Sequence, residues 1–153
     1  MDIPEQLSNE LLEAYIRVSM KLWNERTVKY MPYNEALVCH LLSVQKSLHS
    51  DMPYLTLMQL CEATGILKSQ MNKTLNSLEN QGLITRERST SDKRVVYITM
   101  CEDNLGIYHN EQKNISMIVN RIIEKLGIER SYEAISIFND IASEISVIND
   151  ERK

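Results

Sequence analysis

A run of polar and basic side chains between residues 68 and 94 has the chemistry of a surface that binds a polyanion. Ser69, Gln70 and Asn76 carry hydroxyl and amide groups that can pair with base edges, and neighbouring cations can pair with phosphate. The outward side predicted for this helical stretch has one full charge, the cation Lys73. We predict nucleic-acid contacts from a set of hydroxyl, amide and charged side chains: Lys68, Ser69, Gln70, Asn72, Lys73, Asn76, Ser77, Arg86, Arg88, Asp92, Lys93 and Arg94.

Positive charge is concentrated in the same part of the chain. The protein has a formal net charge of −4 at pH 7. Residues 63–100 contain six basic and three acidic side chains, which gives +3 locally and leaves −7 for the rest. An acidic protein with one positive lobe has the electrostatic footprint expected of a polyanion-binding protein.

Two short helices and a tight turn are predicted to position these side chains. Thr56 and Gln59 have the spacing of a capping box, in which the hydroxyl accepts an amide and the glutamine reaches back. Gly65 supplies the turn, and Gly82 ends the second helix at about Gln81. Apolar residues repeat every three or four positions along the second helix and are predicted to face the core: Met71, Leu75 and Leu78.

A charged hairpin is predicted next. Residues 83–88 and 94–99 are rich in β-branched side chains and are separated by a polar turn. We expect residues 54–55 to add a short third strand. Asp92 and Arg94 stand two positions apart, so on a strand they share a face where the carboxylate can hold the guanidinium.

The stretch GILKSQMNKTLNSLENQGLITRERSTSDKRVVYITM resembles the winged helix-turn-helix of MarR-family transcriptional regulators. The family's Asp-x-Arg wing signature is present at Asp92-Lys93-Arg94, and Leu67 stands where the family often has a capping serine. The resemblance implies that Arg94 enters the minor groove of DNA. It also implies a homodimer built from the first and last two helices, and a small aromatic effector bound near the first helix.

Helices are predicted on both sides of this lobe, at 6–30, 34–47, 102–126 and 131–148. Val44 is among the side chains expected inside the second of them. The terminal helices carry more apolar positions than one small lobe needs to bury. Such surplus apolar surface usually finds a partner chain.

The predicted fold class is mainly α with a small β wing, a winged helix-turn-helix flanked by N- and C-terminal dimerisation helices. The chain, residues 1–153, is predicted to be a single MarR-like domain. Its DNA-binding lobe covers about 53–100, and the dimerisation helices cover about 5–30 and 102–150.

Aromatic and methionine side chains gather around the first predicted helix and its exit. Such side chains suit either a dimer core or a pocket for a small aromatic effector, as the resemblance implies. The candidate effector residues are Tyr15, Met20, Trp23, Tyr30, Met31 and Tyr33.

The cysteines and histidines do not form a recognisable site in the sequence. Cys39 and Cys61 lie on apolar helix faces and are predicted to be small core residues. Cys101 lies near a predicted helix N-terminus, where amides favour a thiolate, so both a spacer and a redox role stay open. The histidines lack the close His, Cys and Glu spacing of a zinc site, so no metal or cofactor is predicted: His40, His49 and His109.

Several classes of protein are disfavoured. No Ser-His-Asp order, glycine-rich phosphate loop or paired carboxylates stand out, so we predict no enzymatic activity. No apolar run reaches membrane-spanning length, and the acidic N-terminus lacks the features of a signal peptide. An odd number of cysteines argues against a disulfide framework, and we expect a cytoplasmic protein.

The leading hypothesis is a homodimeric transcriptional regulator that represses a (pseudo)palindromic DNA operator. Whether a small-molecule effector releases the protein from DNA stays open. The alternative is a winged-helix protein-interaction module without DNA binding. A redox- or metal-responsive variant of the regulator is also open. The cations around the predicted wing favour DNA, because an interaction module has no need for them.

Overall fold

The computed structural model of the protein describes residues 3–22 and 24–152. The chain divides into two compact units, Met1–Asn114 and Ile115–Lys153. Within the described part of the chain, every helix is too short or too polar to cross a membrane.

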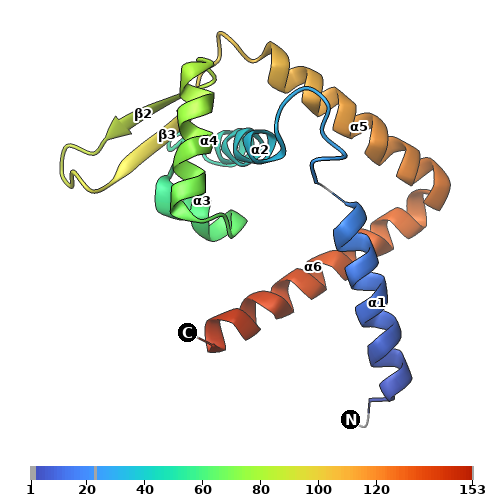
Figure 1. Cartoon of the computed structure of the whole chain (residues 1–153). Coiled ribbons are helices and arrows are strands. Elements are labelled where there is room, and N and C mark those ends of the chain that lie inside the picture. The colour runs from blue at the N-terminus through green and yellow to red at the C-terminus, as the bar shows by residue number, and fades with distance from the viewer. Residues whose placement is uncertain (1–2, 23, 153) are drawn as a thin grey trace. The chain divides into compact units, whose positions relative to one another are not determined.

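The first unit contains a winged helix-turn-helix lobe. Its elements are α2 Tyr33–Leu48, β1 Tyr54–Thr56, α3 Leu57–Thr64, α4 Lys68–Asn80, β2 Ile84–Arg88 and β3 Val96–Met100. The three strands form an antiparallel sheet in the order β1-β3-β2, so the predicted third strand is confirmed. Figure 1 shows the β2–β3 hairpin extending away from α3 and α4.

The core of this lobe lies between α2, α4 and the sheet. Met71, Leu75 and Leu78 are at most 1 % exposed, which confirms the predicted apolar stripe of α4. They belong to one cluster with Leu42 of α2 and Ile98 of β3. Each such side chain stabilises the fold by about 1.5–3 kcal/mol relative to exposure in water. This stripe fixes the rotation of α4 and therefore the side that remains outward.

Local signals set the ends of α3 and α4 as predicted. The Thr56 hydroxyl accepts the Gln59 amide at 3.2 Å, and Gln59 Oε1 accepts the Thr56 amide at 2.8 Å. Gly65 and Gly82 both have a φ of 70°, a left-handed conformation that glycine adopts at little cost.

The first helix, α1, spans Glu5–Lys21 and not the predicted 6–30. A side-chain-stabilised turn replaces the last part of the predicted helix. Asn24 Oδ1 accepts the Arg26 amide at 2.8 Å, and the Thr27 hydroxyl donates to the Asn24 carbonyl at 2.7 Å. Such local side-chain bonds compete with helical hydrogen bonding.

Glu111 of α5 (Gly106–Leu126) holds the segment that follows this turn. Its Oε2 accepts the backbone amides of residues 29–31 at 2.5–3.2 Å. Asn114 donates to Glu111 Oε1 at 2.7 Å and to the Thr27 carbonyl at 2.9 Å. Burial raises the pKa of Glu111, but the bound amides and Asn114 outweigh it, so this pKa is lowered. Three amides that a longer α1 would use internally are thus bound by a carboxylate.

The last two helices also differ in their bounds from the prediction. α5 begins at Gly106 instead of residue 102. In the segment before it, Asn104 Nδ2 donates to the Gln81 carbonyl at 2.8 Å. α6 spans Ile128–Glu151 and begins directly after Gly127 instead of at residue 131. Gly127, at a φ of 83°, separates the two helices as predicted.

Many apolar side chains outside the core are exposed. On α1, Leu7 and Leu11 are 57 % and 59 % exposed, and on α6 Phe138 is 52 % exposed. Val44 of α2 is also exposed, at 39 %, so its predicted place in the core is wrong. The position fits the apolar pattern of α2, but no element among the described residues covers it enough to bury it. Within the described residues, each terminal helix keeps an apolar surface that its own unit leaves in water.

Candidate nucleic-acid interface

The outward face of α4 carries the side chains that the sequence predicted there. Gln70, Lys73 and Asn76 are exposed, together with Ser69 and with Lys68, the first residue of the helix. Amides, hydroxyls and cations therefore line one side of a short rigid helix whose other side is buried. That arrangement can donate to and accept from base edges and pair with phosphates.

Asn72 and Ser77 lie at the edges of this face and are half-buried. The Ser77 hydroxyl accepts a bond from Gln81 Nε2 at 3.1 Å, and the same nitrogen donates to buried Glu35 at 2.9 Å. Asn72 lines a pocket of about 390 Å³ with Arg86 and other residues of the wing strands. These two side chains border the exposed face and do not form its centre.

Arg86 is held by residues of α4. Its Nε donates to Glu79 Oε2 at 2.9 Å, a second nitrogen contacts the same carboxylate, and the Asn76 amide oxygen accepts at 2.7 Å. The Arg86 side chain is 25 % exposed. This geometry joins β2 to the recognition helix. Glu79 was not predicted from the sequence as a partner of Arg86, because the helix and the strand face each other only in the folded lobe.

At the wing tip, the predicted pairing of Asp92 with Arg94 is confirmed. Arg94 Nε and Nη2 donate to the two carboxylate oxygens, each at 3.2 Å, and the Arg94 amide donates to Oδ1 at 3.0 Å. The predicted reason is wrong, because both residues lie in a turn before β3 and not on a strand. The Arg94 side chain is 91 % exposed. Hydrogen bonds from the Arg94 side chain and backbone lower the pKa of Asp92.

Ser89 shapes this tip and was missed in the sequence. It is only 7 % exposed, and its hydroxyl oxygen accepts the amides of Ser91 and Asp92, each at 3.3 Å. The Val95 amide closes the turn on the Asp92 carbonyl at 2.9 Å. A serine in a polar loop gives no signal of burial, so its role follows from the fold.

The two groups of predicted residues are close in space. Lys68 of α4 and Arg94 of the wing line one pocket of about 280 Å³, together with Met58 and Cys61 of α3. Arg88 and Lys93, also on the wing, are exposed. The structure therefore brings one predicted cation of the helix, Lys68, close to one of the wing, Arg94.

The predicted effector residues have mixed surroundings. Tyr15 and Met20 are 51 % and 69 % exposed on α1, and Tyr30 is 42 % exposed. Met31 is 5 % exposed and belongs to the core of the lobe, and Tyr33 is half-buried at the start of α2. Trp23 lies outside the described residues. Met31 is thus a core residue of the lobe, a role that differs from the predicted effector contact.

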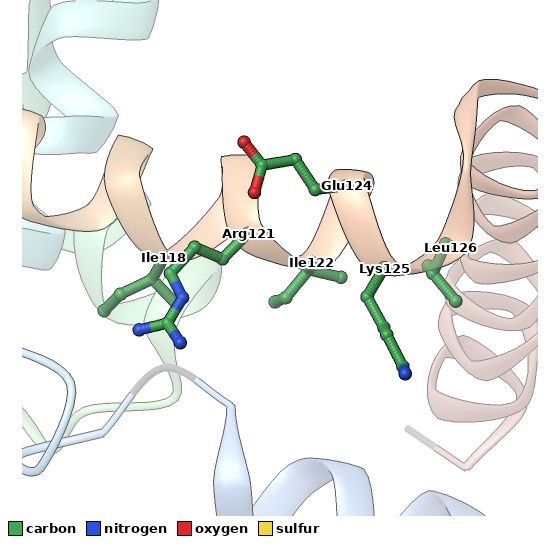
Figure 2. Close-up of a pocket in the computed structure, with 6 residues that line it drawn as sticks. All are labelled: Ile118, Arg121, Ile122, Glu124, Lys125 and Leu126. Carbon is green, nitrogen blue, oxygen red and sulfur yellow. The ribbon is translucent and has the colours of Figure 1, made fainter.

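A different hollow is present in the second unit. It is lined by one stretch of α5: Ile118, Arg121, Ile122, Glu124, Lys125 and Leu126. Figure 2 shows Ile118, Ile122 and Lys125 on the same side of the helix, whereas Glu124 points to the opposite side. Ile122 is 41 % exposed. This hollow is part of the uncovered apolar surface, and its lining among the described residues includes no member of the predicted effector set.

The cysteines behave mainly as core residues. Cys39 is fully buried, and burial, with the Glu35 charge second, raises its pKa to about 12. Cys61 packs against the core, as predicted. Cys101 lies just after β3 and five residues before α5, so the expected place near a helix N-terminus is wrong. In the part of the chain that the structure describes, no three His, Cys, Asp or Glu side chains come together as metal ligands.

Known proteins resemble this chain in sequence and in fold. Residues 48–95, which include β1, α3, α4, β2 and the wing tip, match the MarR family. Over these residues the chain is similar to the MarR family. A Bacillus subtilis (strain 168) relative, the uncharacterized HTH-type transcriptional regulator YwhA, is 26 % identical over 87 residues. That match covers 57 % of this chain and 63 % of the relative's length.

Solved MarR-family structures share the fold. AbsC from Streptomyces coelicolor has a TM-score of 0.70 at 18 % identity, covering 95 % of this chain and 99 % of its own. Sco3205 from the same organism, solved in complex with DNA, has a TM-score of 0.71 at 15 % identity. The match covers 94 % of this chain and 91 % of the Sco3205 chain. Staphylococcus aureus MarR, solved with salicylate and kanamycin, has a TM-score of 0.69 at 22 % identity. The match covers 92 % of this chain and 93 % of the S. aureus chain. The mainly helical fold with a three-stranded wing sheet is the MarR fold.

Proposed function

We propose that this protein binds double-stranded DNA as a homodimer and regulates transcription from the bound site. The observation that carries the proposal is the shared placement of the exposed α4 face and the wing cations on one positive lobe. In this proposal α4 lies in the major groove, where its amides and hydroxyls meet base edges. Arg94, held by Asp92, lies at the minor groove, where narrow A·T stretches attract arginine.

The finer proposal is a repressor of a (pseudo)palindromic operator. Two copies related by a two-fold axis present two recognition helices, so the DNA half-sites mirror the protein symmetry. Support for dimerisation comes from the exposed apolar residues of α1 and α6, because contiguous apolar surface on a monomer usually marks an interface. The single-domain organisation, with a DNA-binding lobe and terminal dimerisation helices, belongs to the same proposal.

An effector site for a small aromatic molecule is a further part of the proposal. Two observations motivate it: S. aureus MarR was solved with salicylate, and Tyr15, Met20 and Tyr30 are accessible here. Trp23 and Tyr33 are retained from the sequence-based set, but Met31 serves the core and is the weakest member. Binding there releases DNA in this proposal.

The alternative, a winged-helix module that binds protein instead of DNA, has support from the net charge of −4. The position of the charges weighs against it. Arg88, Lys93 and Arg94 are exposed on the wing, and Lys73 is exposed on α4. Cations at these places pair with a phosphate backbone and serve no evident purpose in an apolar protein interface.

Binding to the DNA upstream of its own gene, measured at a series of salt concentrations, tests the proposal. We expect affinity to fall linearly with salt on a double-logarithmic plot, because each neutralised phosphate releases counterions. Sedimentation at micromolar concentration should give twice the chain mass. A protein that stays monomeric and binds neither this DNA nor any duplex selected from a random pool is not the proposed regulator.

A further inference from the structure

Leu67 departs from the pattern with which this chain begins its other short helix. In α3, Thr56 and Gln59 form a complete capping box with both reciprocal hydrogen bonds. In α4, Gln70 stands at the equivalent third position, but the N-cap residue is Leu67. A leucine side chain cannot accept the amide bond that serine or threonine accepts there. The chain therefore lacks this cap on the helix that carries the candidate interface.

The Leu67 side chain also lies in solvent. It is 73 % exposed, whereas Met71, one turn later, is fully buried. An exposed leucine alone says little about function, because most protein surfaces contain some. Leu67, however, is an N-cap residue that exposes apolar area and cannot make the usual capping hydrogen bond. Such departures from local sequence preference are expected at positions where function requires them.

We propose that Leu67 contacts the 5-methyl group of a thymine in the major groove and so determines part of the DNA sequence preference. The inference rests on the proposed function. Thymine presents this methyl group in the major groove, and apolar side chains recognise it. Residues at the N-terminal end of a recognition helix contact base edges, and Leu67 immediately precedes the first turn of α4. It adds an apolar contact beside the hydrogen-bonding side chains Ser69 and Gln70.

The charge around Leu67 favours DNA over an apolar protein partner. The next residue, Lys68, is exposed and lines a pocket with Arg94 of the wing. An apolar contact flanked by cations suits a base methyl group next to phosphates. The same surroundings disfavour a hydrophobic protein surface, because the lysine and the arginine would lose hydration there.

Thymine-to-deoxyuridine scanning tests the contact. Duplexes are first selected from a random pool with the wild-type protein, and each thymine of the best site is then replaced singly by deoxyuridine. We expect the wild type to lose about fourfold in affinity at one thymine position, the factor for one methyl-sized apolar group. Leu67→Ala should weaken binding to the thymine duplex by at least that factor. The affinity of Leu67→Ala should not fall further on the deoxyuridine duplex, because the substitution has already removed the contact with the methyl group.

Two variants separate this effect from a change in folding or in general surface character. Leu67→Ser completes a capping box with Gln70, so its melting temperature should rise by roughly 2–8 °C. It should still bind more weakly and be insensitive to deoxyuridine. Leu48→Ala changes a leucine of similar exposure, 70 %, at the end of α2. Leu48→Ala should lose as much affinity as the wild type when the thymine is replaced by deoxyuridine.

The outcomes distinguish this inference from the proposed function. If Leu67→Ala shows the wild-type penalty at every thymine, the methyl contact is rejected while DNA binding stands. If the wild type shows no thymine penalty at all, the inference is rejected in the same way. If no duplex is selected or bound, both the inference and the proposed function fail.

Discussion

Arg86 of β2 is bound to Glu79 of α4 through two guanidinium nitrogens, with the Nε bond at 2.9 Å. Asn76, one turn before Glu79, accepts a further bond from the same guanidinium at 2.7 Å. The pair joins the wing to the helix that carries the candidate interface. Arg86 is therefore better suited to positioning the wing than to neutralising a phosphate, although the sequence places it in the same basic set as Arg88.

Replacement of Arg86 by alanine should thus act on stability first. We expect Arg86→Ala to lower the free energy of unfolding by about 1–2 kcal/mol, a value reduced for the partial exposure of both partners. The slope of log affinity against log salt should stay near the wild-type value. Arg88→Ala is the matched control, because Arg88 is an exposed cation on the same strand. It should leave stability nearly unchanged and reduce the salt slope by about 1. The reverse pattern would make Arg86 a phosphate contact.

Glu111 gives the fold a pH dependence of known sign. Its pKa is lowered in the folded protein, so the carboxylate stabilises the fold above the ordinary glutamate pKa of about 4.3. That contribution is lost as the pH falls through the folded pKa. Glu111→Gln removes the charge and turns an amide group toward three backbone amides, and we expect a loss on the order of 1–3 kcal/mol at pH 7. Urea unfolding at pH 7, 4 and 3 measures both effects.

The variant should approach the wild type in stability at the lowest pH, because the wild-type carboxyl is then protonated too. Glu124→Gln, on the exposed surface of the same helix, is the control and should change stability little at any of these pH values. A constant difference between wild type and Glu111→Gln down to pH 3 would argue against an ionised clamp.

The three thiols should differ in reactivity. Burial and the Glu35 charge raise the pKa of Cys39 to about 12, so its thiolate is scarce at pH 8. Cys61 and Cys101 are half-buried. With an aromatic disulfide reagent, the native protein should show two reactive thiols and a third that is at least roughly tenfold slower until denaturant is added. Cys101→Ser should remove one fast thiol and leave the slow one. Three equally fast thiols would contradict the burial of Cys39.

The helix-turn-helix was predictable because local residues specify it. The capping pair Thr56 and Gln59, the turn at Gly65 and the apolar stripe of α4 each act within a few positions along the chain. The exposed polar face follows directly, since it is the side that the stripe leaves outward. For the same reason, most of the candidate interface could be placed from the sequence before the structure was known.

The end of α1 and the role of Arg86 were not predictable in this way. The carboxylate that binds the amides of residues 29–31 comes from Glu111, about 80 positions later. Sequence periodicity cannot show which distant side chain will take backbone amides away from a helix. Arg86 and Glu79 are seven positions apart, but on different elements, so their contact depends on how β2 packs against α4.

The pairing of Asp92 with Arg94 leads to a prediction whose sign is opposite to that of simple electrostatics. Two side-chain bonds at 3.2 Å and a backbone bond at 3.0 Å fix the arginine at the exposed wing tip. These bonds lower the pKa of Asp92, so its carboxylate stays ionised at neutral pH. Arg94→Ala should weaken DNA binding and reduce its salt dependence, with little change in thermal stability.

Asp92→Ala should weaken DNA binding as well, although it removes a negative charge from the interface. The reason is that an arginine without its carboxylate partner must lose side-chain freedom on binding, whereas the paired arginine has already lost it. Glu87→Ala is the matched control, because Glu87 is an exposed acid on β2 of the same wing. Its removal should tighten binding slightly, as electrostatics alone requires. Affinities of the wild type and both variants, measured on one duplex at one salt concentration, decide the matter. If Asp92→Ala and Glu87→Ala both tighten binding, the carboxylate of Asp92 does not orient Arg94 for DNA.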